Sequence, residues 1–442
     1  MSRVIRGLSL SLAIVTLTSV VFADNWERFR GPNGDGISND KNIPVTFGLK
    51  QNLLWKVPIP GAGNGSPVVW GKSVFIHTAS DDAKQRILLC LDTDTGKTIW
   101  EKTIPGTRYP VRYDSSQASS TPVTDGEAVY VAFWNGKEVI LTAYDCKNGD
   151  LLWNKNLGSF ISQHGAGASP ILYKDKLIFS YDMDAYTEVK EKGKKEGVKK
   201  PTPIAEPSML MAFNKKTGNL LWETPRPAER ACYSAPSLLQ RPGQSEPELV
   251  IVSTHAVSAY SLQDGTKTWE AKDWQVPAVR MPLRTIACSA MVGDVLVACS
   301  GDGAGDRLAV GLTVPKNGNN DPPKKLWQNA KEFPYVPCPL SRGDHFYFVN
   351  DSGYAGCYDA KTGKRVWYER LDESGFTASP VMIDGKIYAA SASGDVFVFP
   401  AETKYNLLAQ NSLGEKMRAT PAVADGRLYL RGERSLFCIA KK

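Results

Sequence analysis

The chain has 442 residues and a formal net charge of +7 at pH 7, with 42% hydrophobic and 22% charged residues. This composition excludes a disordered chain and provides enough apolar side chains for a large core. The 38 glycines, 28 prolines and 11 tryptophans favour a turn-rich all-β protein, and only 4 histidines count against a site built from several imidazoles. Length alone would suggest about three domains.

Residues 1–23 have the pattern of a signal peptide. Arg3 and Arg6 precede an apolar stretch that ends at Phe22, and Ala23 offers a small residue for cleavage. The apolar stretch is shorter than the ~20 residues needed to span a bilayer. The sequence predicts cleavage after Ala23 and export to the periplasm or beyond, with no transmembrane span in the mature chain; an uncleaved anchor is the alternative. The mature net charge falls to +5, and no basic face or motif indicates a nucleic-acid partner.

A short motif recurs eight times between residues 66 and 421, with a mean spacing of about 51 residues. In each copy a small residue and a proline, or close equivalents, precede an apolar run, a tight turn and a second β-rich run. The copies begin at Ser66-Pro67, Thr121-Pro122, Ser169-Pro170, Ala235-Pro236, the degenerate Ser289-Ala290, Cys338-Pro339, Ser379-Pro380 and Thr420-Pro421.

A second motif alternates with the first and ends in tryptophan. It reads Ala/Cys-apolar-Asp-x-x-Thr/Asn-Gly-x-x-x-Trp in its clearest copies. Its glycine supplies the positive φ of a hairpin turn, and its tryptophan is large enough to wedge between neighbouring sheets. The expected blade tryptophans are Trp55, Trp100, Trp153, Trp222, Trp269, Trp327 and Trp367.

Each repeat holds about four short antiparallel strands, which cannot bury both faces alone. Eight such units closing into a ring predict an eight-bladed β-propeller of four-stranded antiparallel blades, as a single domain over residues 24–442. The last copy lacks its tryptophan strand, whereas an unassigned one, around Trp55, lies near the start. We therefore expect the N-terminal strand to complete the last blade. Insertions at about 185–207 and 311–325 interrupt the repeat.

These motifs resemble those of the pyrroloquinoline-quinone-like repeat family, over roughly residues 50–442. The opening segment from Trp26 to Gly36 is also similar to that of exported members. The resemblance implies one of two roles. One branch contains quinone-dependent alcohol and sugar dehydrogenases, which hold the quinone (PQQ) beside Ca²⁺; the other contains non-catalytic propellers similar to BamB, the outer-membrane assembly subunit.

The residues favour the non-catalytic branch. The chain has no adjacent cysteine pair and no evident carboxylate set for Ca²⁺, although a lipid-bearing cysteine typical of BamB is also missing. We expect a binding or assembly scaffold of the periplasm or cell envelope, with no cofactor, no metal and no catalytic residue. The alternatives are a quinone-dependent dehydrogenase with an atypical site and a saccharide-binding propeller. A protein partner of the envelope or an anionic or saccharide ligand is expected, with a monomeric chain.

Candidate ligand-binding residues lie in the segments that enter each inner strand, because these segments crowd the mouth of a propeller's channel. Guanidinium groups and aromatic rings gathered there would suit an anionic or sugar-like ligand; exposed or locally paired arginines are the alternative. The candidates are Arg112, Gln117, His164, Arg230, Arg284, Tyr335 and Arg418.

Three of the eight cysteines, Cys232, Cys288 and Cys338, enter successive inner strands. They lie at positions where a disulfide between blades would be possible in an exported protein. The sequence leaves open whether any pair of them is oxidised.

Overall fold

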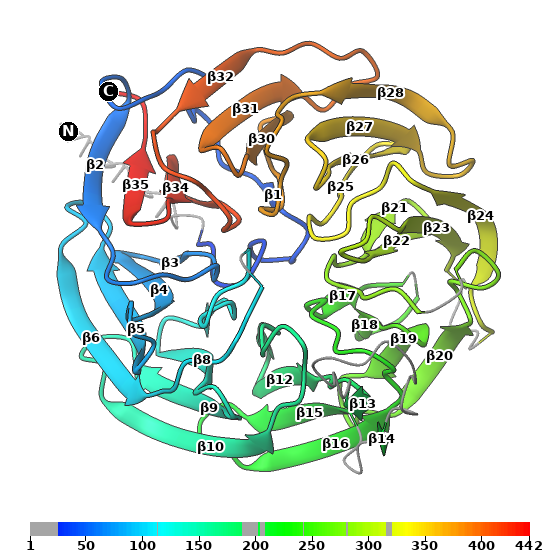
Figure 1. Ribbon diagram of the computed structural model, residues 1–442, viewed down its shortest axis with the longest axis horizontal. Helices are drawn as coiled ribbons and strands as arrows, with labels where there is room; N and C mark the ends of the chain where they lie inside the picture. Colours follow the sequence, from blue (N-terminus) through cyan, green and yellow to red (C-terminus); the bar gives the residue numbers. More distant parts are fainter. Residues whose placement is uncertain are drawn as a thin grey trace, which may run out of the picture.

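Eight four-stranded antiparallel sheets surround a central axis in the computed structural model, as Figure 1 shows. The structure describes residues 25–112, 114–187, 202–203, 208–241, 243–279, 282–314 and 321–442. The signal peptide expected at residues 1–23 lies outside these ranges. No helix in the described part of the chain is long and apolar enough to cross a membrane. The predicted all-β, eight-bladed propeller is confirmed.

Seven blades are continuous in sequence, and each begins with its innermost strand. Blade 1 consists of β3 (Val68–Trp70), β4 (Ser73–Ala79), β5 (Gln85–Asp92) and β6 (Thr98–Pro105), and blade 2 of β7 (Val123–Thr124), β8 (Ala128–Trp134), β9 (Glu138–Asp145) and β10 (Leu151–Ser159). Blade 3 consists of β11 (Ile171–Tyr173), β12 (Lys176–Tyr181), β15 (Ser208–Asn214) and β16 (Leu220–Arg226). Blade 4 consists of β17 (Ser237–Leu239), β18 (Glu248–Val252), β19 (Ala256–Ser261) and β20 (Lys267–Lys272). Blade 5 consists of β21 (Ala290–Val292), β22 (Val295–Gly301), β23 (Arg307–Thr313) and β24 (Lys324–Ala330). Blade 6 consists of β25 (Leu340–Arg342), β26 (His345–Val349), β27 (Tyr354–Asp359) and β28 (Arg365–Arg370). Blade 7 consists of β29 (Val381–Ile383), β30 (Lys386–Ala390), β31 (Asp395–Pro400) and β32 (Ala409–Ser412).

The eighth blade joins the two ends of the chain, as expected. It consists of β33 (Ala422–Ala424), β34 (Arg427–Arg431), β35 (Ser435–Ile439) and the N-terminal strand β2 (Leu53–Pro58). Trp55 lies opposite Cys438, the same pairing as Trp100 with Cys90 in blade 1. The N-terminal strand therefore occupies the register of a regular fourth strand and covers an edge that would otherwise be open.

Several blade tryptophans bond the following blade, in the position expected of a wedge between sheets. The indole N–H of Trp100 donates to the Cys146 carbonyl of blade 2 at 3.0 Å. Gly149 of blade 2 lies against the same ring, because a Cβ there would fall 2.8 Å from it. The same indole-to-carbonyl bond is made by Trp55, Trp153, Trp327 and Trp367. Trp269 instead bonds Glu248 of its own blade.

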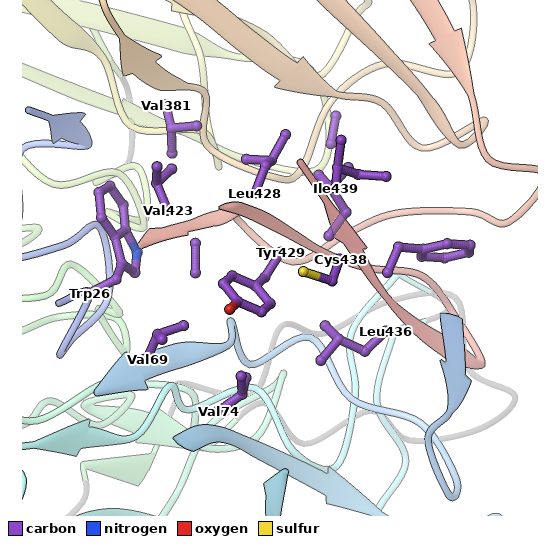
Figure 2. Packing of buried hydrophobic residues seen from close by; sticks show 14 of the residues in the cluster. Trp26, Val69, Val74, Val381, Val423, Leu428, Tyr429, Leu436, Cys438 and Ile439 are labelled. Atoms are coloured by element: carbon purple, nitrogen blue, oxygen red, sulfur yellow. The ribbon is translucent and has the colours of Figure 1, made fainter. Parts of the chain in front are cut away.

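Buried side chains at the junction between the last and first blades form one continuous cluster, part of which Figure 2 shows. Val423 lies near Val381 of blade 7 and Trp26, and the same cluster includes Leu436 of blade 8 and Val69 of blade 1. Burial of apolar area across this junction stabilises the closed ring.

The structure corrects the register of the fifth repeat by one residue. Strand β21 begins at Ala290, so Cys288 and Ser289, not Ser289 and Ala290, take the places of Ser66 and Pro67. The Cys288 N–H donates to Cys338 Sγ at 3.1 Å, the position of the Ser66 N–H bond to Thr121 Oγ1. Ser289 is as small as the first residue of the other copies, so the sequence motif alone is aligned one residue too late.

The described ends of the two predicted insertions lie at opposite faces of the ring, in the β12 to β15 and the β23 to β24 connections. The first contributes a small hairpin of β13 (Tyr186–Thr187) and β14 (Thr202–Pro203) between β12 and β15, and its remaining residues 188–201 and 204–207 are outside the described ranges. The second is shorter than predicted, because residues 311–313 and 324–325 belong to strands β23 and β24. Residues 315–320 are outside the described ranges.

Residues 25–38, which we call the plug, cross the centre of the ring before the chain reaches β2 (Figure 1, blue). Trp26 exchanges backbone hydrogen bonds with Val69 of blade 1. The Arg28 side chain donates to the Pro236 carbonyl at 3.0 Å and that of Arg30 to the Pro339 carbonyl at 2.7 Å, in blades 4 and 6. The plug ends in β1 (Ile37–Ser38), which pairs in parallel with β29 of blade 7.

Candidate functional site

A cavity of about 180 Å³ lies at the ring axis, which we call the cup. Its wall is built from the segments that enter the inner strands, as expected for the mouth of the channel. Phe29 of the plug also lines it. The described wall residues include Asn64, Ser66, Arg112, Asp114, Thr121, His164, Ser169, Tyr233, Tyr335, Thr377, Ser379, Arg418 and Thr420.

Four of the seven candidate residues line the cup, namely Arg112, His164, Tyr335 and Arg418. Gln117 does not, because its side chain serves the structure: its Oε1 accepts from buried Arg86 at 3.2 Å and its Nε2 donates to the Tyr109 carbonyl. Arg230 and Arg284 also lie outside the wall.

Arg284 is buried behind the wall and holds neighbouring segments together. Its guanidinium pairs with Asp184 at 3.0 Å and donates to the Ala231 carbonyl at 3.3 Å and to Gln163. The alternative that the mouth arginines are locally paired therefore applies to Arg284. Its positive charge acts on the cup by lowering the pKa of the wall residues His164, Tyr233 and Tyr335.

Arg112 extends across the mouth. Its Nε lies 3.1 Å from Asp114 Oδ1, and its Nη1 occupies the space that a side chain at Gly303 would need. Gly303 belongs to the turn between β22 and β23 of blade 5, whereas Arg112 precedes β7 of blade 2. A side chain larger than hydrogen at position 303 would therefore displace the Arg112 guanidinium.

His164 is held as a neutral imidazole at neutral pH. Burial, aided by the nearby Arg284 and Arg112 cations and opposed by Asp184 and Asp114, lowers its pKa to about 4. The ring can therefore donate one hydrogen bond and accept another, but it adds no positive charge to the cup.

The two cup tyrosines remain protonated at neutral pH. Burial raises the pKa of Tyr233 and of Tyr335, although Arg284 acts in the opposite direction on both. Tyr233 shares a 2.5 Å hydrogen bond with Ser162, and the Arg307 guanidinium lies 5.4 Å from the Tyr335 ring centre. Both rings thus offer a rigid aromatic wall with a polar edge.

Sequence reasoning missed the floor of the cup. The segment from Trp26 to Gly36 resembles the opening of exported family members, but no motif in it predicts a place inside the channel. Its chemical signal was present in the three glycines at 31, 34 and 36, which adopt φ of +77°, +70° and +78°. A Cβ at Gly34 would collide with the Arg28 guanidinium, so glycine there permits the plug's compact fold.

The family described as Outer membrane protein assembly factor BamB matches residues 50–186, 204–330 and 351–440. The chain belongs to this family. BamB from Moraxella catarrhalis superposes with a TM-score of 0.60 at 12% identity, covering 88% of this chain and 99% of that one. Sqt1 from Saccharomyces cerevisiae superposes at 0.58 and 12% identity, covering 91% and 100%. At such identities these likenesses show the fold alone.

A tetrathionate hydrolase from Acidithiobacillus ferrooxidans is 28% identical over 192 residues, which are 42% of this chain and 33% of that protein. The match therefore spans about a third of that relative's length.

The donor set of this BamB-family cup does not fit a quinone with its Ca²⁺. Calcium takes about six to eight oxygen ligands, several of them carboxylates. Asp114 is the sole carboxylate among the described wall residues, and it already pairs with Arg112. Within the described ranges no three His, Cys, Asp or Glu side chains are grouped to hold a metal ion.

Cys232, Cys288 and Cys338, the three cysteines at which a disulfide between blades was possible, are buried and form no S–S bond in the structure. Cys288 and Cys338 are neighbours through the N–H···S bond described above, whereas the Cys232 thiol donates to the Arg230 carbonyl at 3.1 Å. Cys288 with Cys338 is thus the pair that the fold brings together.

Proposed function

We propose that the protein is an exported, non-catalytic binding scaffold of the periplasm or cell envelope, and that it engages its partner through the mouth face of the ring. Membership of the BamB family supports a scaffold role. The observation that carries the proposal is the chemistry of the cup: its carboxylate is paired with Arg112 and its imidazole is buried. Among the described residues, no hydroxyl donates a hydrogen bond to the Asp114 carboxylate or to the His164 ring, as an activated nucleophile would to its general base.

The mouth face is the better candidate for partner binding because it carries most of the irregular segments. The hairpin of β13 and β14 and the long connection containing Arg112 both lie there. The opposite face holds mainly the tight Asp-x-x-Thr-Gly turns, such as the turn around Gly363 that packs on Trp327. Variable loops on a rigid scaffold commonly provide specificity.

Site-specific photo-crosslinking in the native envelope tests the partner face. A photoreactive residue at exposed Glu373 on the mouth face should yield a discrete protein adduct, whereas the same residue at exposed Lys361 on the opposite face should not. Equal labelling from both positions, or none from Glu373 and two further mouth positions, would overturn the proposal.

The quinone alternative is tested on the purified mature protein. Pyrroloquinoline quinone with Ca²⁺ should produce no stoichiometric absorbance change and no dye-linked oxidation of alcohols or sugars. Tetrathionate should likewise be recovered unchanged after incubation. Turnover of any of these substrates would show that the protein is an enzyme and would overturn the proposed scaffold role.

A further inference from the structure

The wall of the cup carries several hydroxyl groups that accept from the backbone and keep a proton to donate. Thr121 Oγ1 accepts the Ser66 N–H at 2.9 Å, and Ser169 Oγ accepts the Thr121 N–H at 2.9 Å. Thr420 Oγ1 accepts the Ser379 N–H at 3.0 Å in the same way. A hydroxyl that accepts from the protein still has its own proton to donate. For these three hydroxyls no acceptor occurs among the described residues.

Thr377 adds a further unsatisfied group to this wall. Its Oγ1 is buried and has no hydrogen-bond partner in the described part of the chain. An unpaired buried hydroxyl is unfavourable unless something else supplies the partner. A molecule with several acceptor oxygens in the cup would accept the protons of the Thr121, Ser169 and Thr420 hydroxyls of neighbouring blades.

The charges on the wall match one negative charge on the ligand. Arg112 is balanced by Asp114, at 3.1 Å, and His164 is neutral. Arg418 lines the cup and has no carboxylate partner among the described residues, so one cationic group is left uncompensated. A carboxylate is a planar partner that a guanidinium binds through two parallel hydrogen bonds.

The remaining walls suit a compact body with an apolar face. Phe29, Tyr233 and Tyr335 present rings to a cavity of about 180 Å³, which is of the size that holds a six-membered ring. The C–H face of a pyranose can pack on such rings while its hydroxyl oxygens accept from the wall.

We propose that the cup binds a sugar acid of monosaccharide size, with its carboxylate on Arg418 and its ring over Phe29. This inference rests on the proposed function in one respect, that the mouth is the binding face. The plug closes the channel below Phe29, so the ligand enters from the mouth, past Arg112.

Calorimetric titration of the mature protein with glucuronate, gluconate and glucose tests the proposal. Glucuronate should bind in a saturable manner, and glucose, which lacks the carboxylate, should bind at least tenfold more weakly. Gluconate separates the two requirements, since it keeps the acid but is not confined to a ring. Absence of saturable binding by both acids, or equal binding of glucose and glucuronate, would overturn the proposal.

Two variants locate the binding. Arg418→Gln should weaken glucuronate binding about tenfold or more and leave glucose binding unchanged. Arg434→Gln is the matched control, because Arg434 is exposed on the same face and pairs with Asp81 at 2.6 Å. Equal loss in both variants, with unfolding midpoints matching wild type, would contradict the assignment. The crosslinking at Glu373 is read separately, so an empty cup with an intact partner adduct rejects only this inference.

Discussion

At the scale of single residues, the repeated contact between a turn glycine and a tryptophan holds neighbouring blades together. Gly96 adopts φ of +70°, and a Cβ there would lie 2.7 Å from Val57 and 2.9 Å from Trp55. Gly426 has nearly the same φ, +67°, but open space around it. The two glycines separate the effect of backbone conformation from that of packing.

We predict that Gly426→Ala lowers the free energy of unfolding by about 1–2 kcal/mol, the value for a left-handed non-glycine residue. Gly96→Ala should cost about 1–3 kcal/mol more, because its methyl group also overpacks the tryptophan contact. Urea unfolding followed by tryptophan fluorescence measures both. Equal losses would mean that the contact contributes nothing to joining the blades.

His77 gives a prediction about acid stability. It is 1% exposed, its Nδ1–H donates to the Ser120 carbonyl at 3.1 Å, and burial lowers its pKa to about 3. The unfolded chain takes up a proton near pH 6.5, whereas the folded protein does not until about pH 3. The folded state therefore loses about 1.4 kcal/mol per pH unit from this residue as pH falls through that window.

A His77→Gln variant should show a shallower decline in stability than wild type between pH 6 and pH 4. The glutamine amide can still donate to Ser120 but does not titrate. Urea titrations at four pH values check this slope, and His255→Gln provides the control. Parallel slopes for wild type and His77→Gln would mean that the buried imidazole is charged in the folded state.

At the scale of secondary-structure elements, local sequence patterns predict where the strands lie, whereas contacts between residues far apart in the sequence cannot be predicted from such patterns. The strand bearing Trp55 was assignable because its motif is the one missing from the last repeat. The plug was not, because the partners of Arg28 and Arg30 lie 208 and 309 residues away. Gln117 illustrates the same limit for the site: its segment enters the mouth as predicted, yet its amide binds Arg86 rather than lining the cup.

The contributions of the closing strand β2 and of the plug to stability can be separated with two altered chains. Deleting residues 25–60 removes both and should give aggregated protein, since the outer edge of β35 becomes open. A permuted chain that begins at Gly61 and carries residues 53–60 after Lys442, through a short glycine loop, restores β2 as an ordinary hairpin strand. We predict that this permutant is soluble and cooperatively folded, although less stable than wild type.

Circular dichroism and size-exclusion chromatography of the two chains check this prediction. If the 25–60 deletion remains as soluble and stable as wild type, strand β2 does not close the ring. If the permutant aggregates as well, the plug rather than β2 is what stabilises the junction between blades 8 and 1.

At the scale of the whole molecule, the exposed apolar side chains are spread around the rim. They lie on the outermost strands just before the blade tryptophans, and include Leu54, Ile99, Leu151, Leu152, Leu220, Leu221, Leu326 and Val366. Large apolar patches mark protein interfaces, whereas scattered apolar residues do not. The leucine pairs on β10 and β16 of adjacent blades are the densest group, so any self-association would be expected there.

We predict that the protein is a monomer, because its exposed apolar residues are distributed over most blades and do not gather in one patch. Light scattering coupled to size exclusion should give the mass of one chain across a hundredfold range of concentration. The Leu152→Lys, Leu221→Lys double variant should leave this mass unchanged. A dimer that this double variant converts to a monomer would contradict the prediction and place the interface on β10 and β16, because a lysine pair in an isologous contact meets its own symmetry copy.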